Sequence, residues 1–244
     1  MEPERPHLRI EELEVVYGGL LQMPLIRLIS LDSGVPDLLF QSLAAFEPAI
    51  QNTGYAASWH NLSDAYFELK LFDGNGLLRL WPTGTEIRLQ RNAPSLRHLS
   101  LEDLARRISE LITTATTTLE SVDQRVSFAT HSLILSLHAR LTGRTVLEFL
   151  RAYVKEPPNG LGGLAEIGIR YTFQSADERI ASWVFAEPST SIRPNGVFMT
   201  LGVVFNGATT PASTVVDSAR RYFESLASSR ALPVEVLYDS ATFA

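Results

Sequence analysis

At 244 residues, the chain is long enough for one large domain or two closely packed smaller ones, and either can bury a core without disulfides. Apolar residues make up 45% and charged residues 20%, which argues against a disordered or fibrous protein. The formal net charge of -6 gives no overall attraction to nucleic acid or anionic lipid. The absence of cysteine excludes disulfides, thiolate metal sites and cysteine nucleophiles.

The basic residues are almost all arginine, because lysine occurs only at Lys70 and Lys155 among 21 cationic side chains. This imbalance favours a bacterial gene of biased base composition over a requirement for bidentate recognition by arginine. Residues 1–6 are charged and proline-rich, unlike a signal peptide, and no uncharged apolar run reaches the length that crosses a bilayer. We therefore expect a cytoplasmic protein.

The first half of the chain is predicted to run strand, helix, several short strands and a long helix. Runs rich in apolar or alternating residues predict strands at 13–17, 25–31, 55–60, 65–71, 77–81 and 85–90. Ser33 and Gly34 precede a helix, and Ser100 is expected to cap the long helix with Asp103 at the reciprocal position. The Asp-Gly-Asn-Gly run at 73–76 is typical of a hairpin turn, since Asn and Gly tolerate positive φ angles.

The second half is predicted to repeat this order. Strands are expected at 126–139, 165–173, 179–186, 197–206 and 233–238. One helix spans about 146–153 and ends before Pro157, and a long helix begins after Pro211. The glycine-rich run 159–163 joins a helix to a strand, the reverse of the order found in phosphate-binding loops, so it is interpreted as a linker.

Residue matches accompany this repeated order of elements. Gly34 and Gly143 are 109 residues apart, each followed by similarly spaced Leu and Phe. An Asp-x-Ala-Arg-Arg-x-x-Glu sequence begins at Asp103 in the first long helix and recurs 114 residues later at Asp217. The matches favour a tandem duplication, the alternative being chance similarity between helices of common composition.

The predicted fold class is therefore α+β: a tandem duplication of a unit with one strand, a helix, three or four antiparallel strands and a long helix. The units are assigned to residues 1–123 and 124–244, related by a pseudo-twofold axis and able to form one compact domain. Each would be a curved antiparallel sheet packed by its long helix. This order resembles the helix-grip and TATA-box-binding-protein-like architectures, an analogy of fold that implies no function.

Motifs for catalysis are weak. The five histidines lack metal-ligand spacing, and His131 and His138 fall on opposite sides of one predicted strand. No Gly-x-Ser-x-Gly or Ser-x-x-Lys sequence is present to mark a serine nucleophile. The Arg-Arg pairs of the two long helices are better explained by helix-surface ion pairs at i,i+4 spacing than by a phosphate or carboxylate site. We expect no catalytic residue, no metal site and no cofactor.

The strongest candidate for a functional surface is the sheet face that the long helices leave uncovered. Alternation places polar residues and two aromatic residues there in the first unit, and strands around Trp183, Phe185 and Phe198 are apolar on both sides, so something must cover them. The residues assigned to this surface are Tyr66, Glu68, Lys70, Arg79, Trp81, Arg88, Arg170 and Trp183.

These observations favour a non-enzymatic binding or assembly protein that contacts a protein partner, or a copy of itself, through the sheet face. The alternative is a small-molecule-binding or hydrolytic protein with a pocket between sheet and long helix, which a polar residue such as Arg170 or His138 aimed into an apolar cavity would favour. A nucleic-acid-binding saddle is disfavoured by the charge of -6 and the scarcity of lysine. No membrane association is expected.

Overall fold

The computed structural model describes residues 7–30, 34–46, 53–56, 65–90, 99–153, 168–207, 210–230 and 241–243. Over these residues the fold is α+β, with four α-helices and one large sheet. The strands are β1 His7–Leu21, β2 Thr53–Ala56, β3 Tyr66–Leu71, β4 Gly76–Trp81, β5 Gly84–Gln90, β6 Phe128–Thr142, β7 Ile169–Gln174, β8 Ile180–Pro188, β9 Gly196–Asn206 and β10 Ala241–Phe243. The helices are α1 Val35–Phe46, α2 Leu101–Val122, α3 Val146–Arg151 and α4 Val215–Arg230, with short 3-10 helices η1 Ile26–Ile29, η4 Phe72–Gly74 and η5 Ala212–Thr214.

A single sheet runs through both halves of the chain. Its strand order is β2-β3-β4-β5-β1-β6-β9-β8-β7, with all neighbours antiparallel, and β10 adds a short parallel pairing with the start of β1. The two sheets expected from the sequence are thus one, because the 15-residue strands β1 and β6 pair along nearly their whole length. This pairing includes a register shift between Ile10 and Glu12.

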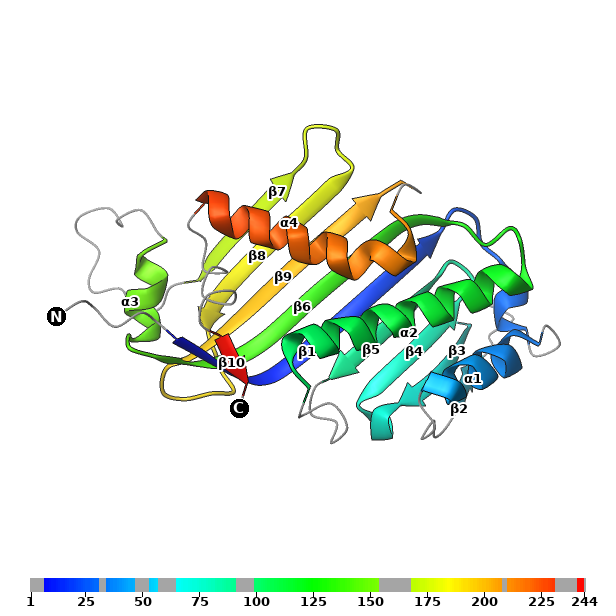
Figure 1. The fold of residues 1–244 in the computed structure, drawn as a ribbon, viewed down its shortest axis with the longest axis horizontal. Coiled ribbons are helices and arrows are strands. Elements are labelled where there is room, and N and C mark those ends of the chain that lie inside the picture. Colours follow the sequence, from blue (N-terminus) through cyan, green and yellow to red (C-terminus); the bar gives the residue numbers. More distant parts are fainter. Residues whose placement is uncertain are drawn as a thin grey trace.

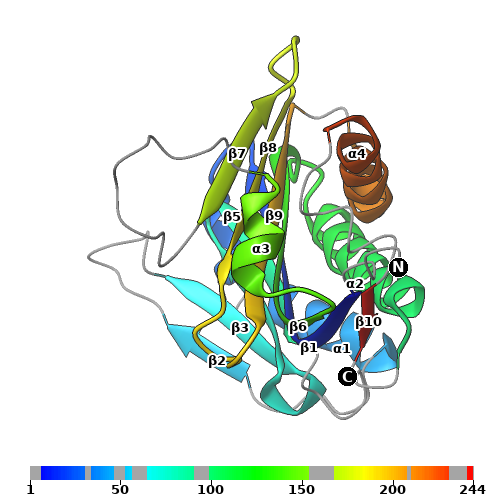
Figure 2. The ribbon, with the colours of Figure 1, turned by 90° about the vertical axis from the view of Figure 1, so that its left-hand side faces the viewer.

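The long helices α2 and α4 lie side by side across the same face of this sheet (Figure 1). Seen along the edge of the sheet, α1, α2 and α4 are on one side, and β2 and β3 curve away from them (Figure 2). Of the described helices, none of α1, α2 and α4 covers the opposite side of the sheet. None of the described helices combines the length and apolar character needed to cross a membrane.

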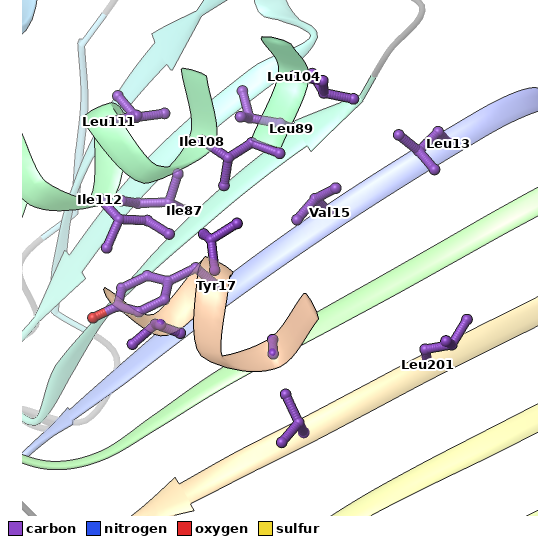
Figure 3. Close-up of a cluster of buried hydrophobic side chains, with 14 of the residues drawn as sticks. Leu13, Val15, Tyr17, Ile87, Leu89, Leu104, Ile108, Leu111, Ile112 and Leu201 are labelled. Carbon is purple, nitrogen blue, oxygen red and sulfur yellow. The ribbon is translucent and has the colours of Figure 1, made fainter. Parts of the chain in front are cut away.

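The core lies between α2 and the strands beneath it. Ile108 and Ile112 of α2 lie nearest to Tyr17 of β1 and Ile87 of β5, Leu104 lies beside Leu89 of β5, and Leu111 lies on the side of the helix away from β1 (Figure 3). All of these side chains are almost fully buried. The apolar stripe predicted for the first long helix is confirmed, since Ile112, Ala115 and Leu119 are also buried. In α4 the residues Val215, Val216, Ala219, Phe223 and Leu226 are buried in the same way.

Local sequence explains how the long helix α2 begins and how its threonine-rich end is held. The Ser100 hydroxyl accepts a hydrogen bond from the Asp103 backbone N–H, as the capping sequence predicts. Threonine is a poor helix former, and Thr113, Thr116 and Thr118 donate hydroxyl hydrogen bonds of 2.7–2.8 Å to carbonyls four residues earlier, so packing must hold this end. Burial of the apolar stripe against the sheet holds the same turns.

The two halves have corresponding strand orders. Reading outward from the centre, β1-β5-β4-β3 matches β6-β9-β8-β7, and along the chain α2 follows β5 and α4 follows β9. Gly34 and Gly143, which both have positive φ angles, precede α1 and α3. Arg106 of α2 pairs with Asp103 and Glu110, and Arg220 makes the equivalent pairs in α4. The motif therefore has the same place and the same surface contacts in both helices.

One predicted strand differs from the structure, and two other predicted segments are not tested by it. The expected strand at 25–31 is wrong: residues 26–29 form η1, whose Leu28 and Ile29 are buried. A run of Leu and Ile is compatible with either a strand or a buried helical turn, so periodicity alone could not decide. The strand expected at 233–238 and the linker at 159–163 lie outside the described residues, and the short strand β10 was not predicted.

We predict that core and charge on α2 contribute separately to stability. Replacing Ile108 by Ala removes a side chain that is 4% exposed and should lower the free energy of unfolding by about 2 to 5 kcal/mol. Replacing Arg106 by Ala should have a much smaller effect, because its side chain is 63% exposed and its ion pairs are screened by water. Urea titrations of both variants provide the measurement, and a larger loss for Arg106→Ala would contradict this orientation of the helix.

Candidate functional site: the helix-free face of the sheet

Strand register places every residue of the predicted binding surface on the side of the sheet that faces away from α2 and α4. Tyr17, Ile87 and Leu89 point towards α2, so their sequence neighbours point to the opposite side. Cross-strand pairing extends this assignment from β1 and β5 to the rest of the sheet. The face so defined, here called the helix-free face, carries Tyr66, Glu68, Lys70, Arg79, Trp81, Arg88, Arg170 and Trp183.

The structure divides these residues into two groups at opposite ends of the face. Six belong to β3, β4 and β5, whereas Arg170 and Trp183 belong to β7 and β8. Strands β1, β6 and β9 lie between β5 and β8, and at about 4.8 Å per strand the separation of β5 from β8 is about 19 Å. The residues between the groups, including Val16, Ile134 and Thr200, were not identified from the sequence.

Ion pairs order the charged end of the face. Arg79 donates hydrogen bonds of 3.0 and 2.6 Å to one carboxylate oxygen of Glu68, and its guanidinium lies 4.9 Å from the ring centroid of Tyr66. The hydrogen bond to Glu68 is the main cause that raises the pKa of Arg79 above its usual value. Arg88 lies 3.8 Å from Glu14 and 3.3 Å from Glu86. Glu68 and Arg79 are thus directly opposed on neighbouring strands, whereas Arg88 pairs diagonally with Glu14 of β1 and with Glu86 of its own strand.

The whole face is close to electrically balanced although the chain carries a net charge of -6. Register assigns five carboxylates and six cations to it over the described strands, namely Glu12, Glu14, Glu68, Glu86 and Glu187 with Arg9, Lys70, Arg79, Arg88, Arg140 and Arg170. Arg140 also pairs with Glu11 at 2.9 Å. The excess negative charge of the protein therefore lies elsewhere.

A shallow hollow of about 230 Å³ lies at the charged end of the face. The turn at Gly74, Asn75 and Gly76 forms one side, and Lys70 and Arg88 reach in from the adjoining strands. Glu68 and Gln90 complete a polar lining around Leu77. The mixed charge and small volume suit a contact between polar surfaces better than the enclosure of a substrate.

Aromatic side chains form the other end of the face. The Trp183 indole lies directly over Gly202 of β9, so close that a Cβ at Gly202 would be 2.0 Å from Cζ2. Phe198 contacts both Phe185, with ring centroids 6.1 Å apart, and His138, at 4.6 Å. The predicted apolar character on both sides of these strands is confirmed, since Met199 is fully buried on the helix side and these aromatic residues are half-buried on the other.

A serine and a histidine meet on this face without forming a catalytic pair. His138 Nδ1 and the Ser189 hydroxyl are 2.8 Å apart, a contact that joins positions 51 residues apart in sequence and that no spacing predicted. The Ser189 oxygen accepts hydrogen bonds from the backbone N–H groups of Ser191 and Ile192, and Ser189 is buried. Because its oxygen is occupied by two donors, the hydroxyl stabilises the turn and orients His138 and is not available as a nucleophile.

His131 lies on the opposite side of β6 from His138, as the odd spacing predicts. It is buried, with Nδ1 2.9 Å from the Tyr17 hydroxyl and its ring against Phe128. Burial lowers the pKa of His131, whereas burial and the charge of Glu120 raise the pKa of Tyr17. Both groups therefore remain neutral inside the core and link β1 to β6.

No three His, Asp or Glu side chains in the described ranges lie close enough together to hold a metal ion. Arg170 and His138, which were considered as residues aimed into a cavity under a helix, both face away from α2 and α4.

The chain matches no protein-family model, and no curated protein is significantly similar to it. Its function must therefore be inferred from its own surface and cavities.

Replacing Gly202 by Ala should dislodge the Trp183 indole from the sheet, because the new methyl group would occupy the same space as the ring. We expect a loss of stability and a red shift in tryptophan fluorescence as the indole moves towards water. Gly168→Ala is the matched control, since its nearest neighbour would be the Glu187 Cβ at an ordinary 3.9 Å. Equal spectra for the two variants would contradict the position assigned to Trp183.

Burial of His131 predicts a loss of stability in acid. Its pKa in the folded protein lies below the ordinary value of 6.5, so the unfolded chain binds a proton first as the pH falls below about 6.5. The contribution of His131 to the free energy of unfolding is complete above pH 6.5. It is lost progressively as the pH falls from 6.5 through the lowered pKa of the folded protein. Urea titrations at pH 8 and pH 5 should show a smaller decrease for His131→Gln than for the wild-type protein, and equal decreases would contradict the assignment.

Proposed function

We propose that the protein is a non-enzymatic assembly protein whose helix-free face binds another protein surface, and that this partner is a second copy of the same chain. The observation that carries the proposal is the composition of the face: half-buried aromatic side chains at one end and mutually paired charges at the other. Partly exposed aromatic surface bordered by polar residues is typical of a protein contact site.

Charge favours self-association over contact with a polyanion or a strongly basic partner. Two copies with a net charge of -6 each repel one another at long range, but two helix-free faces that are each nearly neutral can approach closely. A twofold contact would also let cations of one copy meet carboxylates of the other. The ion pairs on the face already fix these side chains, which lowers the entropy cost of binding.

We also infer that the chain arose by tandem duplication of one unit, with the boundary near residue 123. Support comes from the corresponding strand orders of the halves and from the equivalent ion pairs of Arg106 and Arg220. In this view the order of elements in each half resembles that of the helix-grip and TATA-box-binding-protein-like architectures.

Self-association is tested by placing a charge in the middle of the aromatic end. Thr200 of β9 lies between Ser136 and Phe185 on neighbouring strands and is half-buried. We expect the wild-type protein to be dimeric by light scattering after gel filtration at micromolar concentration, and Thr200→Arg to shift it to monomers by at least tenfold in dissociation constant. Burying an unpaired guanidinium in the contact would oppose association.

Thr117→Arg is the matched control, because Thr117 is exposed on α2, away from the helix-free face. This variant should remain dimeric, and both variants should retain the circular dichroism spectrum of the wild type. A wild-type protein that is monomeric up to 100 µM, or a dimer that Thr200→Arg leaves intact, would refute self-association through this face.

A further inference from the structure

A second site lies on the other side of the sheet, beside α4. An open cleft of about 510 Å³ separates the first turns of α4 from the start of β8 and the end of β9. Its volume falls within the range of about 300 to 1,000 Å³ that is typical of small-molecule sites. The turn between β7 and β8 forms its outer wall.

Two arginines from separate elements line this cleft. Arg221 comes from the second turn of α4 and has no carboxylate partner among the described residues; its Nε donates a 3.3 Å hydrogen bond to the backbone carbonyl of Asp217. Arg179 comes from the β7–β8 turn and lies 3.6 Å from Asp177, with both side chains more than half exposed. The described lining thus contains one carboxylate and two guanidinium groups, which gives it a net positive charge in a protein of net charge -6.

Asp177 is already committed within its own turn. Its carboxylate accepts hydrogen bonds from the Ser175 hydroxyl and the Arg179 backbone N–H, and the first of these is the main cause that lowers its pKa. It stays ionised and fixes the turn that carries Arg179. An anion in the cleft would therefore find Arg179 already positioned.

The rest of the lining combines hydroxyl donors with an apolar floor. Thr210 and Ser218 contribute hydroxyl groups on the α4 side. Ile180 and Phe205 are cross-strand partners that form the floor, and the ring of Tyr222 is held by a 2.8 Å hydrogen bond between its hydroxyl and that of Ser182. Two guanidinium groups and two hydroxyls offer more donors than the two oxygens of a carboxylate can accept, whereas a phosphate has three free oxygens.

We propose that this cleft binds a small organic phosphate, with the phosphate at the arginine rim and the organic group on the apolar floor. A guanidinium fork matches phosphate oxygens in geometry, and a carbon skeleton buries the floor that an inorganic anion would leave exposed to water. This site is independent of the proposed assembly face, because it lies between α4 and the sheet and shares no residue with that face.

Calorimetric titration of the full chain with phenyl phosphate tests the proposal, with inorganic phosphate and benzoate as comparison ligands. We expect phenyl phosphate to bind at least tenfold more tightly than either. Arg221→Gln and Arg179→Gln should each weaken it at least tenfold. Arg220→Gln is the matched control, because Arg220 is the neighbouring arginine of α4, is paired with Asp217 and Glu224, and does not line the cleft.

Each alternative result has a definite meaning. No binding of phenyl phosphate at millimolar concentration, or equal weakening by Arg220→Gln and Arg221→Gln, would overturn the site. Equal affinity for inorganic phosphate would refute the role of the apolar floor, and equal affinity for benzoate would refute selection of phosphate. Thr200→Arg should bind phenyl phosphate as the wild type does, so this test and the test of self-association fail independently.

Discussion

The pairing of β1 with β6 is the interaction on which the rest of the structure depends. These two strands are first in their respective halves, and their antiparallel pairing joins two series of strands into one sheet. Side chains alternate along both strands, so this register decides at once which residues face α2 and α4 and which face the other way. The hydrogen bond between Tyr17 and His131 lies across this central pair, within the core.

Because of this pairing, both long helices cover the same face of the sheet. Along the chain α2 follows β5 and α4 follows β9, and each helix crosses back over the same face, where its apolar stripe is buried. The side chains of the other face must then be stable without a long helix above them. At one end they meet this condition through cross-strand ion pairs, as with Arg79 and Glu68, and at the other by laying Trp183 flat over Gly202.

Local chemistry that looks catalytic in isolation acquires a structural meaning in this fold. His138 and Ser189 are in contact, but two backbone donors occupy the serine oxygen.

The arginines of the motif shared by the two long helices also have different roles. Arg106 and Arg220 are held in ion pairs with acids of their own helices, whereas Arg221 turns towards the cleft beside α4. Adjacent arginines of the repeated motif, Arg220 and Arg221, therefore have different surroundings.

The sequence by itself determined those elements whose signals are local. The capped helix from Ser100, its apolar stripe and the hairpin turn at Gly74 were predicted because capping, periodicity and positive φ depend on neighbours in the chain. Alternation also placed the six predicted surface residues of β3, β4 and β5 on one side of the sheet, since period-two patterning does not require knowledge of the partner strand. The run containing Leu28 failed because a short apolar segment fits either a strand or a buried turn.

Only the tertiary structure decided what depends on strands meeting across the sheet. It joined the two expected sheets through β1 and β6 and separated the predicted surface residues into two groups at opposite ends of the face. It also brought Ser189 to His138, and Arg179 and Arg221 to one cleft, from positions distant in sequence. Such contacts are set by register and by the path of the chain between elements, and no pattern within one segment encodes either.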